Sequence, residues 1–109
     1  MKRMGMVIRL KTDKIQEYKR LHADVWPDVL KTIEKANIKN YTIFLREPEN
    51  LLFGYWEYHG IDFEADSAKI AADPRTQEWW KITDSLQIRM ESSKANEQWS
   101  IMEEVFHTD

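Results

Sequence analysis

Alternating apolar and polar positions mark three extended segments in the first half of the chain. Residues 4–10 and 38–46 alternate with a period of two, whereas residues 51–58 are apolar on both faces. A period of two is typical of a β-strand, and a strand that is apolar on both sides needs a cover on each side. Since the connection 47–50 is short and contains Pro48, we expect the second and third segments to form an antiparallel hairpin.

Helical periodicity separates the first of these strands from the second. We expect a first helix over about residues 13–24, with Asp13 as its N-terminal cap and a glutamine three residues later, as in a capping box. A second helix over about residues 27–36 begins at Pro27, which fits a first helical position and forces a change of direction. Asn37 is a suitable stop for this second helix.

The second half of the chain predicts two more helices, a loop and a last strand. Two helices are expected over about residues 62–72 and 74–84, because an aspartate begins each of them and a proline follows the second aspartate. Residues 85–98 are polar and poorly periodic, which indicates an irregular loop that contributes to function or to flexibility. Residues 99–107 alternate again and predict a final strand.

The order β-α-β-β-α-β is the ferredoxin-like split motif of the α+β class, and residues 1–109 have the length of one domain. Four antiparallel strands with their helices on one face leave the other face bare. Because residues 51–58 are apolar on both faces, we expect this bare face to be buried. Two such sheets that pack face to face form a homodimer, a dimeric α/β barrel.

Composition excludes several classes of function. The formal net charge is −3, so no basic field attracts the chain to nucleic acid or to an anionic membrane. Cysteine is absent, which excludes disulfides, thiolate metal ligands and a cysteine nucleophile, and which fits a reducing cytoplasm. No apolar run is long enough to span a bilayer, and residues 1–11 show no secretory signal, so a soluble cytoplasmic protein is expected.

One face of the predicted helices contains a tyrosine and a histidine among its apolar residues. It consists of Ile15, Tyr18, His22, Val25 and Val29. Tyr18 and His22 are spaced i, i+4, so their side chains are neighbours on a face that should point inward. A titratable ring and a phenol that point into a small domain suggest the wall of a pocket, although a histidine on an apolar face is more often an ordinary core residue than a catalyst.

Several short blocks of the chain resemble the L-rhamnose mutarotases. They are Glu17-Tyr18, Arg20-x-His22, Trp26-Pro27 with Leu30, Asn40-Tyr41-x-Ile43, Asn50-Leu51-Leu52-Phe53, Trp79-Trp80-Lys81 and Glu103-Glu104-Val105-Phe106. The blocks follow one another over nearly the whole chain, and together they are specific. The segment 58–66 departs from the family pattern, and if it forms part of the pocket rim it bears on which sugar is bound.

This resemblance implies an enzyme that interconverts the α and β anomers of a 6-deoxy-aldohexose pyranose, with L-rhamnose as the first choice and L-fucose as another. It implies that His22 transfers protons and that Tyr18, Tyr41, Trp79 and Trp80 contact the sugar. The alternative for the tryptophan pair is a place in the helix core. Neighbouring helix positions point about 100° apart, so at most one of the two faces the sugar squarely.

Anomer exchange suits a chain with this composition. The ring opens when the ring oxygen gains a proton and the anomeric hydroxyl loses one, and no redox group, metal or nucleophile is required. A group that titrates near neutrality serves this exchange best, which favours His22. Tyr18, Tyr41 and a water molecule are all candidates for the second proton-transfer group. We therefore expect neither a metal nor an organic cofactor.

Two alternatives belong to other classes of function. A non-catalytic ligand-binding protein or a cofactor-free monooxygenase could use the same dimeric α/β-barrel fold, because fold alone does not define function. Metal sites could be drawn around His22 or around His59, but their spacing matches no dedicated ligand pattern. The joint presence of several aromatic hydroxyls, an imidazole and a tryptophan pair favours a sugar over a hydrophobic substrate.

Overall fold

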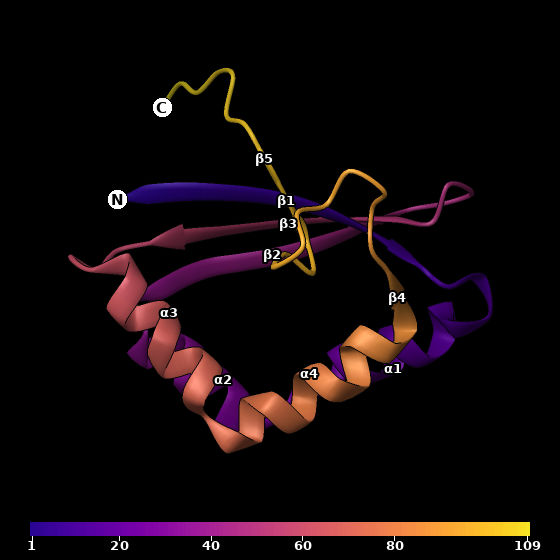
Figure 1. The fold of residues 1–109 in the computed structure, drawn as a ribbon, viewed down its shortest axis with the longest axis horizontal. Coiled ribbons are helices and arrows are strands. Elements are labelled where there is room, and N and C mark those ends of the chain that lie inside the picture. The colour runs from indigo at the N-terminus through magenta and orange to yellow at the C-terminus, as the bar shows by residue number, and fades with distance from the viewer.

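An antiparallel sheet and a layer of helices beneath it make up the protein, and the computed structural model describes all of residues 1–109 (Figure 1). The strands are β1 (Lys2–Leu10), β2 (Ile38–Arg46), β3 (Leu51–Tyr58), β4 (Gln87–Ile88) and β5 (Ser100–Met102). The helices are the short 3₁₀ helix η1 (Thr12–Lys14), α1 (Ile15–Ala23), α2 (Pro27–Lys35), α3 (Phe63–Ala72) and α4 (Pro74–Leu86).

The sheet has the strand order β2-β3-β1-β4, and all of its pairings are antiparallel. This is the order of a ferredoxin-like fold, so the predicted fold class is confirmed. β5 lies beside β1 as an additional short strand. All four α-helices lie on the same side of the sheet, as the prediction required (Figure 1).

The core fills the space between the helices and the sheet. Alternate residues of β3 are buried on the helix side, where Leu52 packs with Ile8, Leu10, Tyr18 and Leu86 in one cluster. A second cluster toward the other end of the sheet consists of Met6, Ile38, Trp56 and Tyr58. The first cluster contains Tyr18 of α1 and Leu86 of α4, so it packs both helices against the sheet beside the site described below.

Most helix boundaries follow from their local signals. Pro27 occupies the first turn of α2, and Asn37 follows that helix with a positive φ of 64°, a backbone conformation in which asparagine is favoured. Asp62 accepts a hydrogen bond from the Ala65 amide at 3.1 Å at the start of α3, and Asp73 caps α4 in the same way. The predicted boundaries of these helices are confirmed to within a residue or two.

Three details of the prediction are wrong. Asp13 is not a helix cap, because it lies within η1 and no side chain caps the first helix by hydrogen bonding. Residues 85–88 are not loop: burial of Leu86 extends α4, and Gln87–Ile88 then pairs with β1. Only Ser100–Met102 of the predicted last strand pairs, since the chain beyond it leaves the sheet.

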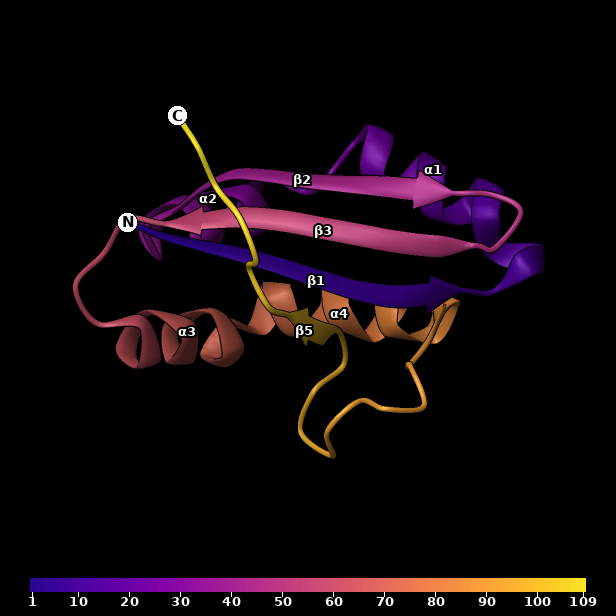
Figure 2. The same ribbon diagram turned by 90° about the horizontal axis from the view of Figure 1, so that it is seen from above.

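The face of the sheet opposite the helices is covered only by the C-terminal segment, which crosses it after β5 (Figure 2). Arg3 and Glu104 form an ion pair of 2.6 Å that holds this segment near β1. Phe44 lies directly across from Phe53 on this face and is 63% exposed. No helix is long and apolar enough to cross a membrane.

Candidate functional site

A cavity of about 360 Å³ opens between α1, α4, β2 and the loop 89–99. It brings together all five residues that the sequence singled out: Tyr18, His22, Tyr41, Trp79 and Trp80. Its remaining lining residues are Ile43, Thr83, Asp84, Gln87, Asn96, Gln98 and Trp99. The cavity therefore combines aromatic walls with several amide, hydroxyl and carboxyl groups, which is the composition of a small-molecule site.

Tyr18 and His22 form one wall of the cavity as a stacked pair. Their positions one turn apart on α1 place the rings side by side, with centroids 4.2 Å apart and planes 24° from parallel. The Tyr18 side chain is buried against Ile8, Leu10, Leu52 and Leu86, whereas His22 is partly exposed toward the cavity. The packing of Tyr18 thus fixes the plane on which the imidazole lies.

One hydrogen bond decides the tautomer of His22. Its Nδ1 lies 2.9 Å from the carbonyl oxygen of Tyr18 in the preceding helical turn. A carbonyl can only accept, so Nδ1 carries the hydrogen and the neutral ring presents Nε2 as an acceptor. Partial burial lowers the pKa of His22 below its usual 6.5, so the ring is mainly neutral at pH 7.

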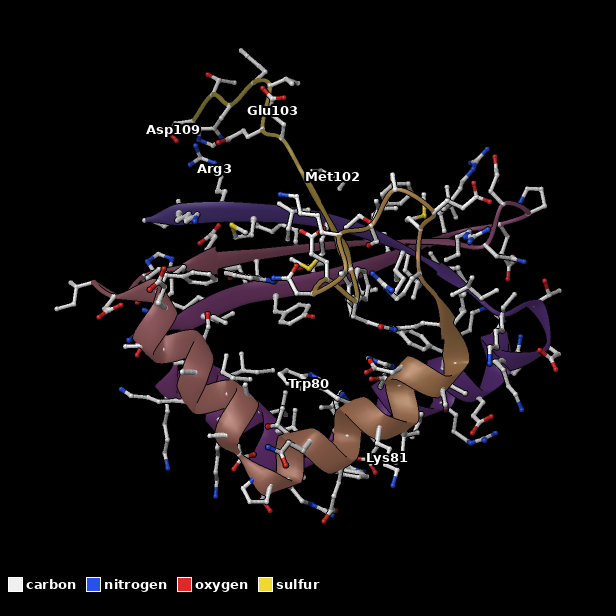
Figure 3. The ribbon with its side chains drawn as sticks, viewed as in Figure 1. Arg3, Trp80, Lys81, Met102, Glu103 and Asp109 are labelled. Atoms are coloured by element: carbon white, nitrogen blue, oxygen red, sulfur yellow. The ribbon has the colours of Figure 1, made fainter.

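The two neighbouring tryptophans have different surroundings. Trp79 is only 6% exposed and meets His22 edge to face at 5.4 Å and Trp26 at 5.1 Å. Trp80 is 40% exposed, lines the cavity and lies on the side of α4 that faces the sheet, while Lys81 points away (Figure 3). Trp79 therefore supports the imidazole, and Trp80 offers a free aromatic surface to a ligand.

Tyr41 reaches the cavity because β2 is irregular at this point. The pairing register with β3 shifts between Lys39 and Thr42, and Asn40 has a positive φ of 53°. Tyr41 and Ile43 then face the helices and line the cavity. The Tyr41 side chain is 42% exposed overall, but desolvation of its hydroxyl raises its pKa above the usual 10, so the phenol stays protonated at neutral pH.

The sequence reasoning missed the lining residues that follow the tryptophan pair. Thr83 and Gln87 lie one and two turns after Trp79, and Asp84 lies one turn after Trp80. The same i, i+4 rule that linked Tyr18 to His22 points to Thr83 and Asp84, which lie within the predicted helix, whereas Gln87 falls in the segment predicted as loop. Asp84 is the one carboxylate in the cavity lining, and partial desolvation raises its pKa.

The loop 89–99 supplies the last wall. Arg89 ties the loop together by donating hydrogen bonds to the carbonyl oxygens of Lys94 and Glu97, the second at 2.9 Å. The hydroxyls of Ser93 and Ser100 lie 2.7 Å apart and close its far end. These bonds bring Asn96, Gln98 and Trp99 to the cavity, although the polar and irregular sequence before Trp99 gave no periodic signal.

The segment 58–66 lies elsewhere, because none of its residues lines the cavity. The segment therefore does not form part of the rim of this cavity, and the condition under which it would bear on the choice of sugar is not met here. Asp66 of α3 is instead buried against the end of the sheet, where it accepts hydrogen bonds from the Tyr58 hydroxyl at 2.6 Å and from the Asn37 side chain at 3.1 Å. The departure of this segment from the family pattern affects the anchoring of α3, not the cavity wall.

Comparison with known families agrees with this geometry. The model of a family described as L-rhamnose mutarotase matches residues 3–108. The chain belongs to the L-rhamnose mutarotase family. An L-rhamnose mutarotase of Oceanobacillus iheyensis is 34% identical over 109 residues, and one of Lactiplantibacillus plantarum is 33% identical over 110 residues. Both alignments cover 100% of each chain.

A solved structure supports the fold independently of the sequence. The crystal structure of an L-rhamnose mutarotase from Formosa agariphila superposes with a TM-score of 0.77 and covers 100% of both chains at 20% sequence identity. At this identity the likeness shows the fold. Membership of the mutarotase family identifies the chain as an isomerase with a monosaccharide substrate.

Proposed function

We propose that this protein is an L-rhamnose mutarotase that interconverts the α and β pyranose forms of the sugar in the cavity beside α1. The observation that carries the proposal is the stacked Tyr18–His22 pair, which lies in a cavity walled by tryptophan in a chain of this family. Neither a simple binding protein nor a monooxygenase accounts for that combination.

His22 is the proposed proton carrier. Its Nδ1–H is held by the Tyr18 carbonyl, so the lone pair of Nε2 is available to take the proton of the anomeric hydroxyl. Its lowered pKa keeps this lone pair free at neutral pH. The anomeric hydroxyl and the ring oxygen are bonded to the same carbon, so two proton-transfer groups must stand side by side, and the stacked phenol and imidazole meet that requirement.

The remaining lining residues suit a deoxy sugar. Trp80 can stack on the apolar C–H face of a pyranose, while Ile43 offers a place for a methyl group. Tyr41, Asp84 and Asn96 can each form hydrogen bonds with sugar hydroxyls. We assign substrate binding to Tyr18, Tyr41, Trp79 and Trp80, with Trp79 acting mainly through its contact with His22.

We further propose a cytoplasmic homodimer in which each chain forms one domain. The absence of cysteine is what a reducing compartment allows. The bare sheet face bears exposed Phe44 beside Phe53 and Val7, an apolar surface that a second copy would cover. No metal or organic cofactor is assigned to the reaction.

Saturation-transfer NMR of reducing sugars tests this function directly. The protein is added to L-rhamnose, L-fucose and D-glucose in parallel, and exchange of magnetisation between the two anomeric protons is measured. We expect accelerated exchange with L-rhamnose, at a higher kcat/KM than with the other two sugars. Exchange of all three at the uncatalysed rate would contradict the proposed function.

A further inference from the structure

Gln87 lies at the point where α4 ends and β4 begins, and the mechanism above gives it no role. Its backbone pairs with Leu10 of β1, and its side chain is buried, with the residue only 7% exposed. A buried amide needs partners for both its donor and its acceptor. Gln87 finds both of them in the cavity.

The side chains of Gln98, Gln87 and Tyr18 form a directed chain of hydrogen bonds. Gln98 Nε2 donates to Gln87 Oε1 at 3.3 Å, and Gln87 Nε2 donates to the Tyr18 hydroxyl oxygen at 3.4 Å. The bond from Gln98 fixes which end of the Gln87 amide faces Tyr18. The Tyr18 oxygen is thus engaged as an acceptor, while its own hydrogen is bonded to no protein group.

We propose that Gln87 is a positioning residue for the reaction: by donating to the Tyr18 oxygen, it commits the Tyr18 O–H to the ring oxygen of the bound sugar. This inference rests on the proposed function and selects Tyr18 as the second proton-transfer group. Gln98 supports it from the loop 89–99 by holding the Gln87 amide in the required orientation.

The resulting ring opening removes one proton from the sugar and returns one to it. His22 Nε2 takes the proton of the anomeric hydroxyl, the bond between the anomeric carbon and the ring oxygen breaks, and that oxygen takes the proton of Tyr18. Imidazolium and phenolate form side by side while the sugar is an open aldehyde. After rotation about the bond between the first two carbons, the ring closes on the other face of the carbonyl and both protons return.

Gln87 also stabilises negative charge on the Tyr18 hydroxyl oxygen. Burial raises the pKa of the Tyr18 phenol, whereas the hydrogen bond from Gln87 acts in the opposite direction. An N–H that points at the phenolic oxygen stabilises the negative charge that develops there when the proton leaves. The amide therefore favours proton donation at the moment when burial alone would oppose it.

The substitution Gln87→Glu tests the inference with little change of shape. A carboxylate can only accept, so it takes the Tyr18 hydrogen away from the sugar and repels a developing phenolate. We expect kcat for L-rhamnose exchange to fall about 10²-fold or more, the usual effect of removing a donor to a developing oxyanion. KM should change far less. Gln16→Glu, which adds the same charge at an exposed position near Tyr18 in the sequence, should leave kcat unchanged.

A double-mutant cycle shows whether Gln87 acts through Tyr18. In a Tyr18→Phe background, where no phenol remains, Gln87→Glu should cause no further loss of kcat. An equal loss in both backgrounds, or a near-wild-type kcat for the single variant, would overturn the inference. A wild-type protein that exchanges no sugar in the same assay would instead contradict the proposed function.

Gln98→Glu provides a second test outside the sheet, should Gln87→Glu fail to fold by circular dichroism. A carboxylate at position 98 can only accept a hydrogen bond. It would therefore bind the Gln87 Nε2–H group, and the Gln87 amide would turn its Oε1 toward Tyr18. We expect about a tenfold loss of kcat that disappears in the Tyr18→Phe background, as for a positioning group whose effect is indirect. An unchanged kcat for a folded Gln98→Glu variant would count against the chain of hydrogen bonds.

Discussion

At the scale of single residues, the properties of His22 come from two neighbours. The Tyr18 carbonyl holds the hydrogen on Nδ1, and the Tyr18 ring and Trp79 bury the imidazole from two directions. Burial disfavours the charged form and lowers the pKa of His22. The imidazole is therefore held in the neutral form that the proposed mechanism requires of a base.

This lowered pKa predicts the pH dependence of the enzyme. In the proposed mechanism the neutral imidazole is the active base, so kcat should rise with pH through a midpoint below 6.5 and then reach a plateau near neutral pH. The measurement is the enzymatic exchange rate of L-rhamnose across this pH range, after subtraction of the rate without enzyme. A plateau that persists well below pH 5, or a rate that falls as pH rises toward 7, would disagree with His22 as base.

The same shift has a consequence for stability. His22 binds a proton more weakly in the folded protein than in the unfolded chain. Its contribution to the free energy of unfolding is therefore complete above about pH 6.5 and declines as the pH falls through the interval between the two pKa values.

Trp80 is the tryptophan whose fluorescence should report sugar binding. It is exposed at the cavity, whereas Trp79 is enclosed by His22 and Trp26. We predict that Trp80→Phe removes most of the emission change that L-rhamnose causes. Trp56→Phe is the matched control, because Trp56 packs on Phe63 in the other core cluster and should leave the change intact. Retention of the full change in Trp80→Phe would place the sugar elsewhere.

At the scale of elements, the sequence predicted those parts of the fold that depend on local rules. The alternation of the strands, the short turn 47–50, the break at Pro27 and the two aspartate caps all act within a few residues, and the confirmed elements rest on such local signals. The end of α4 and the strand β4 depend on tertiary packing of Leu86 and on pairing with β1, which no local pattern reveals.

The site residues divide in the same way between those marked by local sequence and those placed by tertiary structure. Tyr18 and His22 were found because helical spacing and an out-of-place imidazole mark them, and Tyr41 and the tryptophan pair were found by resemblance. Asp84 lies at the end of the helix as predicted, but its place one turn after Trp80 was not followed into the cavity, whereas Gln87 was missed because residues 85–98 were taken as loop. The loop residues Asn96 and Gln98 reach the cavity through hydrogen bonds of Arg89 that have no sequence signature.

Gly54 of β3 has no side chain, which leaves space beside the cavity wall, and a substitution there tests how tightly this space is filled. A Cβ atom there would lie 2.9 Å from Cγ of Met6 and 3.3 Å from the ring of Trp99. We predict that Gly54→Ala destabilises the fold by about 1–3 kcal/mol, the usual cost of overpacking, and lowers the affinity for sugar because Trp99 lines the cavity. Thermal unfolding and a sugar titration measure the two effects.

Gly5 offers the matched control for this substitution. It lies in the adjacent strand, where a new Cβ would meet only Cε of Met102, at an ordinary 3.5 Å. Gly5→Ala should therefore leave the sugar affinity unchanged and cost far less stability than Gly54→Ala. Equal melting temperatures of the two variants would show that the space around Gly54 is not tightly filled.

At the scale of the whole molecule, the helices cover one face of the sheet and only a thin C-terminal segment crosses the other (Figure 2). Val105 and Phe106 of that segment are themselves 87% and 78% exposed. A chain with this much apolar surface outside its core is expected to associate, and the two-fold pairing of bare faces is the economical arrangement.

Phe44→Arg is the variant that tests this association. It places a charge within the proposed contact without touching the helix-side core, because Phe44 pairs with Phe53 on the bare face. We predict a dimer for the wild type and a folded monomer for the variant in sedimentation velocity at micromolar concentration. Ile61→Arg, at a fully exposed apolar position before α3, should remain dimeric. A monomeric wild type would refute the dimer.

The central claim is that His22 carries the proton in a mutarotase reaction, and saturation-transfer NMR of L-rhamnose with wild type and His22→Asn tests it most directly. Asparagine can keep one hydrogen bond but cannot exchange a proton near pH 7, so binding and circular dichroism should persist while the exchange rate falls about 10²- to 10⁴-fold. A folded His22→Asn variant that binds L-rhamnose and exchanges its anomers at the wild-type rate would contradict the account.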